Sequence, residues 1–537
     1  MRKLFLLIYI ASIYILICVT SCSHNDNISD DKAICLNYID INKDTIFLSD
    51  STTNSIEFKL HSTKQNLNVK TDSTQTGIDI LSTTEGDIST TLYKLQNIEI
   101  MLDRDGTTLY RAYIKDLGLS NNYNEDAILR VRCVDEDNNE YTLEKKFHVK
   151  YCVETGLPIL YIETPEKQII QSKTEWIKNA EYKLIAPHDA VLSTGKLSIK
   201  GRGNSSWNFP KKSYSLKFSE KVELLGMPQN KRWVLLANWM DRTLLRNTVS
   251  FEIARKTNID WIPRGQFVDV VLNEERVGNY FICEQIRVDN NRVNVSELSK
   301  NDIDDEIITG GYLLELDTNF DEKIKFKSAI YQLPYMIKSP DEDNCNDKQI
   351  DYIYNYIAEF EKCLSDSVRI MRGDYREYID VESFIDYWIV NELAENNEPG
   401  HPKSFYMYKE RGQKLKAGPV WDFDWKTYVL WKTNDFSCMK AIYYQRLFID
   451  PLFVAKVKQR WDEIKPELQT IPDYIRKEAE LIRLSEAKNH RLWPINIVDW
   501  QVNEDFDLTF DQSVTRLMNS FILKMHWLDE YLNKRNI

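Results

Sequence analysis

The sequence predicts an α+β protein in which an all-β domain precedes a larger, two-lobed α+β domain. Three observations favour this fold class. Short segments of alternating polarity fill residues 33–152, further strands follow from 158 to about 290, and apolar stripes at helical spacing occupy about 345–537. The chain of 537 residues is also too long for one ordinary core.

The N-terminus predicts export. Arg2 and Lys3 precede a nearly unbroken apolar run, residues 4–19, and small residues stand directly before Cys22. This order is typical of a signal peptide, residues 1–21, ending at a bacterial lipoprotein cleavage site. Cys22 would then carry the lipid and residues 22–32 would form a polar tether. The alternatives are an ordinary signal peptide or an uncleaved anchor, although the run is short for a span of about 20 residues.

A lipoprotein of this kind is expected in the cell envelope, facing the periplasm or the cell exterior, on the outer membrane if the cell has one. Cleavage removes two positive charges and no acidic residue, so the formal net charge moves from −13 to −15. Such a surface repels phosphate backbones, which excludes nucleic acid as an expected partner.

The remaining seven cysteines are widely scattered and show no CxxC spacing. This pattern predicts neither a zinc site nor a disulfide framework. We expect buried, apolar thiols. The alternative in an oxidising compartment is a disulfide joining Cys133 to Cys152 or to Cys35.

The first domain, residues 33–152, predicts a β-sandwich of immunoglobulin-like type, because short alternating strands are separated by clusters of turn residues. The clearest strands are residues 55–60, 95–102, 109–114, 128–133 and 141–149. We find no catalytic pattern in this domain and interpret it as a spacer between the membrane and the second domain.

The second domain, residues 158–537, begins with strands and ends with helices. Strands are predicted at residues 197–200, 212–218, 233–237, 266–273 and 277–285. One helix, 241–256, interrupts them, with Asp241 as its expected N-cap. Among the later helices a hairpin is predicted from strands 405–409 and 414–420.

The first motif of chemical interest lies between two of these strands. Arg202, Asn204 and Ser205 belong to a short loop with two glycines, in which backbone N–H groups could bind phosphate oxygens. On the following strand, alternation puts Lys212 on the same face as the apolar residues, and Lys211 on the other. Because a buried ammonium needs an anion, Lys212 is the predicted phosphate ligand. The alternative is a lysine that extends to solvent at the strand start.

The second motif is the segment 421–425, in which Asp422 and Asp424 alternate with aromatic residues after a strand. Two carboxylates at this spacing converge on one side of an extended chain and suit Mg²⁺ or Mn²⁺. Turn or cap aspartates are the alternative, but the apolar neighbours would make unpaired charges costly.

A third motif precedes it. Glu398 stands where a proline and a glycine end a helix, one hairpin before the Asp pair. It is the candidate acceptor of a proton from an attacking hydroxyl. His401 would position substrate or neutralise charge, or it is simply a structural loop histidine.

Together these motifs resemble the CotH family of atypical, protein-kinase-like phosphotransferases, from about Pro158 to the C-terminus. The similar segments are residues 202–205, 211–214, 232–237, 278–284, 311–315 and 421–424. The resemblance implies a kinase-like fold that transfers the γ-phosphoryl group of ATP to Ser or Thr hydroxyls of surface or secreted proteins.

The resemblance also implies roles for single residues. Lys212 or Lys211 would hold nucleotide phosphates, and Arg246 would assist with their charge. Glu284 and Ile286 belong to the segment that would join the lobes and contact adenine. Asp422 and Asp424 would hold Mg²⁺ or Mn²⁺.

The chain departs from the family pattern at two places. Glu398 stands where many members have Asp, and Lys403 and Ser404 stand where an Asn often follows. A base displaced by about 1 Å can cost on the order of a hundredfold in rate. Two alternatives therefore remain: an inactive, pseudokinase-type binding lipoprotein, and a glycosyltransferase that uses Asp422 and Asp424 to hold a metal for a nucleotide-sugar.

Overall fold

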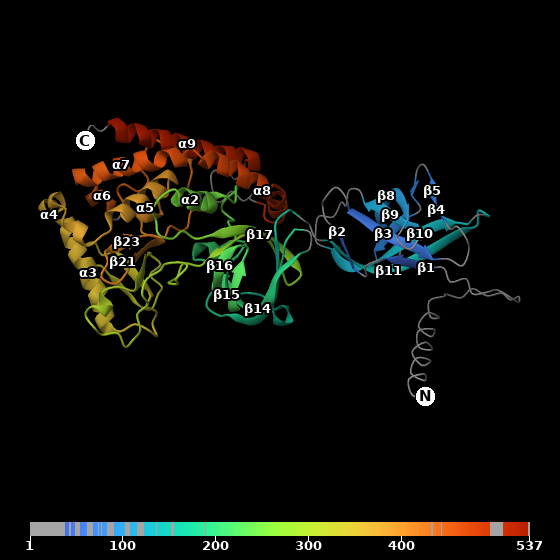
Figure 1. Cartoon of the computed structure of the whole chain (residues 1–537), viewed down its shortest axis with the longest axis horizontal. Helices are drawn as coiled ribbons and strands as arrows, with labels where there is room; N and C mark the ends of the chain where they lie inside the picture. Colours follow the sequence, from blue (N-terminus) through green and yellow to red (C-terminus); the bar gives the residue numbers. More distant parts are fainter. Residues whose placement is uncertain are drawn as a thin grey trace. The chain divides into compact units, whose positions relative to one another are not determined.

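The computed structural model describes strand segments between residues 38 and 151, and residues 155–534 apart from 188–189, 431–432, 442 and 495–507. The chain divides into two compact units, Met1–Val153 and Glu154–Ile537 (Figure 1). The predicted signal peptide, the tether and Cys22 lie outside the described residues, as do Cys35 and Cys152.

The first unit is built from β-strands in its described part. The strand order is β1-β3-β9-β8-β7-β10-β11-β2, with β4 beside β10 and with β5 paired to β6. These strands are β1 (Tyr38–Ile41), β2 (Thr45–Leu48), β3 (Asn54–His61), β4 (Asn68–Val69), β5 (Thr71–Asp72), β6 (Gln75–Thr76), β7 (Ile78–Ser82), β8 (Thr91–Leu102), β9 (Thr108–Ile114), β10 (Tyr123–Val134) and β11 (Glu140–Tyr151).

Alternating residues of these strands form one core. Phe58 on β3 stacks on Tyr110 of β9 at 5.5 Å between ring centroids, and Leu129 and Val131 of β10 belong to the same cluster. Cys133 is buried and free in this core, as expected for an apolar thiol. The strands predicted at 55–60, 95–102, 109–114, 128–133 and 141–149 correspond to β3, β8, β9, β10 and β11.

The second unit opens with a closed barrel of strand order β12-β13-β14-β15-β16-β18-β17. Parallel pairing of β12 with β17 closes it, and every other neighbouring pair is antiparallel. Its strands are β12 (Ile159–Glu163), β13 (Ile177–Ile185), β14 (Val191–Arg202), β15 (Ser213–Leu224), β16 (Met227–Leu236), β17 (Gly265–Leu272) and β18 (Glu275–Glu284).

The barrel is filled by alternate residues of each strand. Ile199 on β14, Leu216 on β15 and Trp233 on β16 are fully buried and cross-strand neighbours. Residues between them point outward, which leaves the outer face of β14–β16 for other contacts.

Helix α2 (Arg246–Arg255) connects β16 to β17 and starts later than predicted. Asp241 does satisfy the helix start, because its Oδ2 accepts a hydrogen bond of 2.8 Å from the backbone N–H of Arg246. The prediction that the helix begins after Asp241 is wrong, since Asp241 first bonds the backbone N–H and hydroxyl of Thr243 in a turn.

The rest of the unit is a sheet covered by helices. The sheet order is β20-β21-β19-β22-β23, and α7, α8 and α9 lie together along one side (Figure 1). The elements are β19 (Tyr312–Leu316), β20 (Lys325–Lys327), β21 (Pro334–Ser339), α3 (Asp347–Ser365), α4 (Ser367–Arg372), α5 (Val381–Leu393), β22 (Phe405–Lys409), β23 (Leu415–Ala417), α6 (Tyr444–Leu447), α7 (Pro451–Leu468), α8 (Ile471–Leu492) and α9 (Phe510–Lys534).

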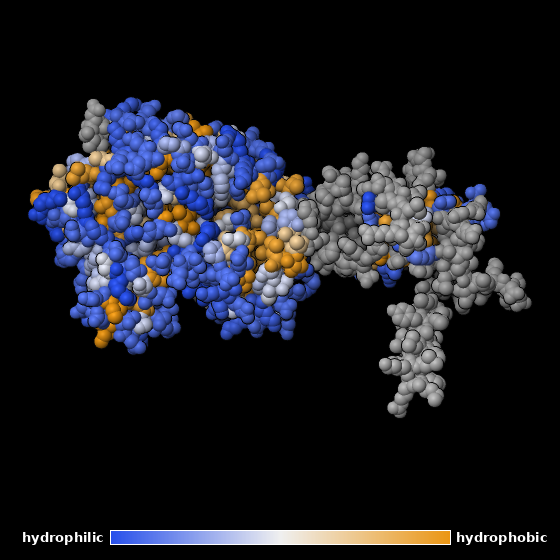
Figure 2. All heavy atoms as spheres, in the orientation of Figure 1, coloured by the Kyte–Doolittle hydropathy of each residue, from blue (hydrophilic) through white to orange (hydrophobic). Residues whose placement is uncertain are grey.

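Five short 3-10 turns connect these elements in the described part: η1 (Pro165–Lys167), η2 (Ser205–Asn208), η3 (Ile307–Thr309), η4 (Asp374–Glu377) and η5 (Glu398–Gly400). The drawn face of the second unit is mostly hydrophilic (Figure 2). Within the described residues, none of the helices combines the length and the apolarity that crossing a membrane requires. The mixture of strands and helices is that of an α+β protein.

Candidate active site

A cleft of about 530 Å³ lies in the second unit. One wall comes from the outer side of the barrel, at the ends of β14, β15 and β16, and from α2. The opposite wall comes from β19, β21 and the segments 398–406 and 421–425. The cleft therefore lies between the barrel and the sheet that carries the helices.

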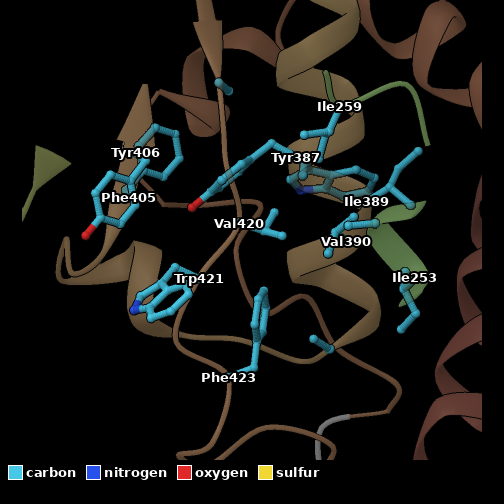
Figure 3. Close-up of a cluster of buried hydrophobic side chains, with 14 of the residues drawn as sticks. Ile253, Ile259, Tyr387, Ile389, Val390, Phe405, Tyr406, Val420, Trp421 and Phe423 are labelled. Atoms are coloured by element: carbon cyan, nitrogen blue, oxygen red, sulfur yellow. The ribbon is translucent and has the colours of Figure 1, made fainter. Parts of the chain in front are cut away.

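Asp422 and Asp424 line this cleft because the aromatic residues that precede each of them are anchored in the core. Trp421 and Phe423 are buried (Figure 3), and both rings pack on Phe251 of α2. The backbone N–H of Phe423 also donates to Oδ1 of Asn247 at 2.9 Å. Both carboxylates line the cleft, although the backbone does not stay extended at Asp422 as the sequence expectation required.

The backbone at Asp422 has a φ of 71°, in the left-handed region. A side chain other than glycine is strained there, and such strain persists only where the surrounding structure imposes it. The Ser404 hydroxyl donates to Asp422 Oδ2 at 3.1 Å and helps to fix the carboxylate.

The electrostatic environment of the Asp pair disfavours two negative charges. Burial raises the pKa of Asp424, and the charges of Asp422 and Asp241 raise it further. The side chain of Asp422 is exposed to solvent in the cleft. Desolvation by the surrounding protein nevertheless raises the pKa of Asp422, and the positive charge of Arg202 opposes this shift. A cation in the cleft would relieve the repulsion.

Glu398 lies beside the pair, at the first position of η5. Its side chain is buried, and burial, followed by the charge of Asp422, raises its pKa to about 8. Such a carboxylate exchanges its proton near neutral pH, which suits a general base.

His401 also lines the cleft, with Nε2 at 3.6 Å from Glu398 Oε1. Its ring is half-exposed, and partial burial lowers its pKa. A neutral imidazole here would donate to Glu398 or accept from a substrate hydroxyl.

The end of β14 contributes Arg202 to the cleft, and the loop and 3-10 turn that follow contribute Asn204 and Ser205. Arg202 stacks on the Trp421 ring at 4.9 Å, and its Nη1 is a buried donor with no hydrogen-bond acceptor in the described part of the chain. Gly203 has a φ of +107°, and a Cβ there would lie 2.1 Å from the Ser206 hydroxyl, so only glycine fits. The cleft thus contains a guanidinium nitrogen that is available to a bound anion.

The prediction that Lys212 is the inward lysine is wrong, and Lys211 lines the cleft instead. The apolar face of β15 points into the closed barrel, so the cleft lies against the opposite face. Lys211 is 1% exposed, donates to the carbonyl oxygens of Ala237 (2.8 Å) and Asn279, and lies 4.4 Å from the Tyr280 ring centroid. Burial holds its pKa well below the usual range. Lys212 donates to the Trp207 carbonyl at 2.6 Å.

Three other predicted residues lie outside the cleft lining. Glu284 is fully buried and paired with Arg264 at 2.8 Å, and Ile286 packs against the main core. Arg246 lies 3.4 Å from Asp241, and its charge lowers the pKa of Asp424. The positive charge of Arg246 thus acts on Asp424 although Arg246 does not line the cleft.

Sequence reasoning missed a second acidic pair in the cleft, Glu315 and Asp317 at the end of β19. Lys338 on β21 pairs with Glu315 at 3.1 Å and with Glu322, and Asp317 accepts from the N–H of Asn319 at 2.7 Å. The signal was available, because Glu315 and Asp317 repeat the i, i+2 spacing of Asp422 and Asp424.

The donor set fits a divalent cation only in part. Within the described ranges, no group of three or more His, Cys, Asp or Glu is arranged to hold a metal ion. Asp422 and Asp424 supply hard oxygen atoms at the cleft surface. This suits Mg²⁺ or Mn²⁺, which take one or two carboxylates and complete their coordination with substrate phosphates and water.

A sequence model of the family described as CotH kinase protein matches residues 199–530, whereas no curated protein gives a significant match. Among solved structures, the major pilin subunit BcpA of Bacillus cereus is 11% identical over 36% of this chain and 62% of that chain, less than two thirds of its length, with a TM-score of 0.13. Extracellular cadherin domains 1-4 of protocadherin gamma B7 are 10% identical over 57% of this chain and 69% of that chain, with a TM-score of 0.15. Such low TM-scores carry no argument.

Proposed function

Since the chain belongs to the CotH kinase protein family, we propose that its second unit is a two-lobed, protein-kinase-like phosphotransferase. It would move the γ-phosphoryl group of ATP to Ser or Thr hydroxyls of surface or secreted proteins. The observation that carries the proposal is the convergence of Asp422, Asp424, Glu398 and Arg202 on one cleft.

Each of these residues has a role that its surroundings favour. Arg202 would bind phosphate oxygens with its unpartnered Nη1. Asp422 and Asp424 would hold Mg²⁺ or Mn²⁺, which would neutralise phosphate charge. Glu398 would accept the proton of the acceptor hydroxyl as its oxygen bonds to the γ-phosphorus and the bond to the β–γ bridging oxygen breaks, releasing ADP.

We further propose that the protein is a lipoprotein anchored through Cys22, with an immunoglobulin-like first domain. Its location would be the cell envelope, and its partners would be nucleotide and an exported acceptor protein. Labelling of the lipid at Cys22, and its loss in Cys22→Ala, would test the anchor.

The central test is phosphotransfer by the purified mature chain with γ-labelled ATP and Mn²⁺ or Mg²⁺. Self-labelling or labelling of exported proteins is expected for wild type and for Asp462→Asn, an exposed carboxylate on α7. Asp424→Asn should lower it by a factor on the order of 100 or more. Absence of any transfer by folded wild type would reject the enzyme.

A second candidate is a binding lipoprotein without turnover. The glutamate at position 398 favours it, because its longer side chain shifts the position of the base relative to the family pattern. ATP with Mn²⁺ would then raise the melting temperature of wild type, while no labelled product forms, and Glu398→Asp would restore transfer if the shift is the cause.

A further inference from the structure

The outer face of the barrel carries a group of cations next to the cleft. Lys200 on β14, Lys217 on β15 and Arg232 on β16 alternate with residues of the barrel core and therefore lie on the outer face of the barrel. Lys217 lies directly across from Arg232 in the strand register, an arrangement of like charges that destabilises a sheet. With Arg287, which follows β18, these residues form what we name the basic face.

Trp176 lies at the centre of the basic face. Lys200 Nζ is 4.9 Å and the Arg232 guanidinium carbon 5.1 Å from its ring centroid. Burial and then the charge of Arg232 lower the pKa of Lys200, and burial and then the charge of Arg287 lower that of Arg232. Arg232 is thus close enough to Lys200 and to Arg287 for their positive charges to repel one another.

No carboxylate in the described part of the chain forms an ion pair with the cations of this face. None of its four cations has an ion-pair partner there, whereas Lys338, across the cleft, pairs with both Glu315 and Glu322. Glu322 is the acidic group whose charge acts on Lys200, and it lines the cleft.

The basic face is continuous with the cleft at one end. Arg202, which lines the cleft, is two residues from Lys200 on the same side of β14, a separation of about 7 Å. At the other end Arg287 lines a hollow of about 780 Å³, together with Lys221 and Lys231.

Two of the three carboxylates that line this hollow accept hydrogen bonds. Asp289 accepts from the Asn230 amide and the Asn291 N–H, and Glu410 accepts from the N–H groups of Ser296 and Arg411. Glu297 is exposed at the rim. The lining of the hollow thus carries three cationic and three acidic side chains, so the excess of positive charge lies on the basic face rather than in the hollow.

We infer that the basic face is the docking site for an acidic segment of the phosphoacceptor protein; this rests on the proposed function of the cleft. A short Asp- or Glu-rich stretch would neutralise cations that form no ion pair in the described part of the chain. A long polyanion such as nucleic acid does not fit, because the whole chain carries a net charge of −13. The acidic residues would lie about two to six positions from the phosphorylated hydroxyl, since an extended chain spans roughly 3.3 Å per residue.

The test is direct binding of a fluorescent 12-residue peptide with one serine and flanking Asp and Glu, compared with its Asn and Gln counterpart. The full chain is used as wild type, as the triple variant Lys200→Glu, Arg232→Glu, Arg287→Glu, and as its neutral version Lys200→Gln, Arg232→Gln, Arg287→Gln. The matched control is Lys440→Glu, Lys477→Glu, Arg491→Glu, three exposed cations elsewhere on the second unit.

Wild type and control should prefer the acidic peptide by a factor of about 10 or more at 50 mM salt, and less at 200 mM. Both basic-face triples should lose this preference while melting temperature and its rise with ATP and Mn²⁺ stay unchanged. Equal binding of the two peptides to wild type, or equal loss in the control, overturns the inference. Binding of anionic vesicles but not of the peptide also overturns it, in favour of a membrane contact.

Phosphotransfer is measured in an assay separate from peptide binding. Self-labelling without peptide binding would reject the docking site and leave the proposed function standing. Peptide binding that the triples abolish, without any phosphotransfer, would reject the proposed function and leave an acidic-segment binding site.

Discussion

At the scale of single residues, the cleft brings carboxylates close together at positions that the protein partly shields from solvent. Glu398 illustrates the effect, because burial and Asp422 together shift its pKa from 4.5 to about 8. Between these values the folded protein holds a proton that the unfolded chain has released. The free energy of unfolding therefore falls as the pH rises through this window and levels off above it.

This shift gives a first prediction. Glu398→Gln removes the titration, so in EDTA the variant should match wild type near pH 4.5 and exceed its stability at pH 8.5, by about 4 kcal/mol. Thermal unfolding of both proteins across this range measures the difference. Parallel pH profiles would show that Glu398 titrates normally.

A second prediction concerns Arg202. Arg202→Met keeps an apolar side chain over Trp421 but removes the unpartnered guanidinium. Affinity for ATP with Mn²⁺ should fall by roughly 10-fold or more, because a charged hydrogen bond contributes about 1.5 to 3 kcal/mol. Isothermal titration measures it, with Lys178→Met, an exposed residue of β13, as the control. Unchanged affinity would remove Arg202 from the phosphate site.

At the scale of elements, the segment 421–424 shows how the core positions chemistry. Phe423 is fully buried against Phe251, and its backbone is bonded to Asn247 of α2. The position of both carboxylates therefore depends on the packing of this ring (Figure 3).

The third prediction follows from this packing. Phe423→Ala should lower the free energy of unfolding by about 3 to 5 kcal/mol and weaken the melting shift caused by Mn²⁺ with ATP. The control Leu430→Ala, at a side chain that is 38% exposed, should stay within about 0.5 kcal/mol. Denaturant unfolding measures both, and a small loss in Phe423→Ala would contradict the anchoring role.

Much of the element order could be predicted from sequence, because alternation and helical spacing are local signals. The strands β14–β18 and the hairpin β22–β23 were predicted on this ground. Closure of the barrel was not, because the parallel pairing of β12 with β17 joins segments far apart in sequence. The same non-local pairing explains why the prediction for Lys212 is wrong, because the apolar face of its strand lines the interior of the closed barrel.

The residues of the candidate site could likewise be predicted only in part. Asp422, Asp424, Glu398 and Arg202 stand in short motifs with a recognisable chemistry, and all four line the cleft. The resemblance assigned Glu284 to the segment that would contact adenine, but its carboxylate is paired with Arg264, which only the fold brings near.

At the scale of the whole second unit, a buried polar network joins the barrel to the helices. Asp269 on β17 accepts from the hydroxyls of Thr155 and Ser485 and pairs with Arg276 at 3.0 Å. Ser485 belongs to α8, whose Trp493 cap also donates to the Val277 carbonyl at 3.0 Å. The barrel is thus connected to helix α8 through polar contacts.

The fourth prediction tests this connection. Asp269→Ala would leave Arg276 without its carboxylate in a buried site, which typically costs about 3 to 5 kcal/mol. The loss should appear as lower cooperativity in urea unfolding of the second unit, whereas Asp351→Ala on the exposed side of α3 should have little effect. An unaffected transition would show that the network is dispensable.

The fifth prediction concerns the division of the chain. Residues 154–537, produced alone, should unfold in one transition that coincides with a transition of the full chain, because each unit has its own core. Differential scanning calorimetry measures both. A fragment that fails to fold would show that the second unit depends on the first.

The strand that completes the barrel has a consequence for biosynthesis. Ile159–Glu163 enters the growing chain first, yet one of its two hydrogen-bonding neighbours, Gly265–Leu272, follows roughly 100 residues later, about 5 to 20 s at usual translation rates. During that interval one edge of the strand lacks a hydrogen-bonding neighbour, and nascent chains would aggregate through this unpaired edge. A chaperone that covers this edge early should therefore raise the yield of active protein more than one that acts after release.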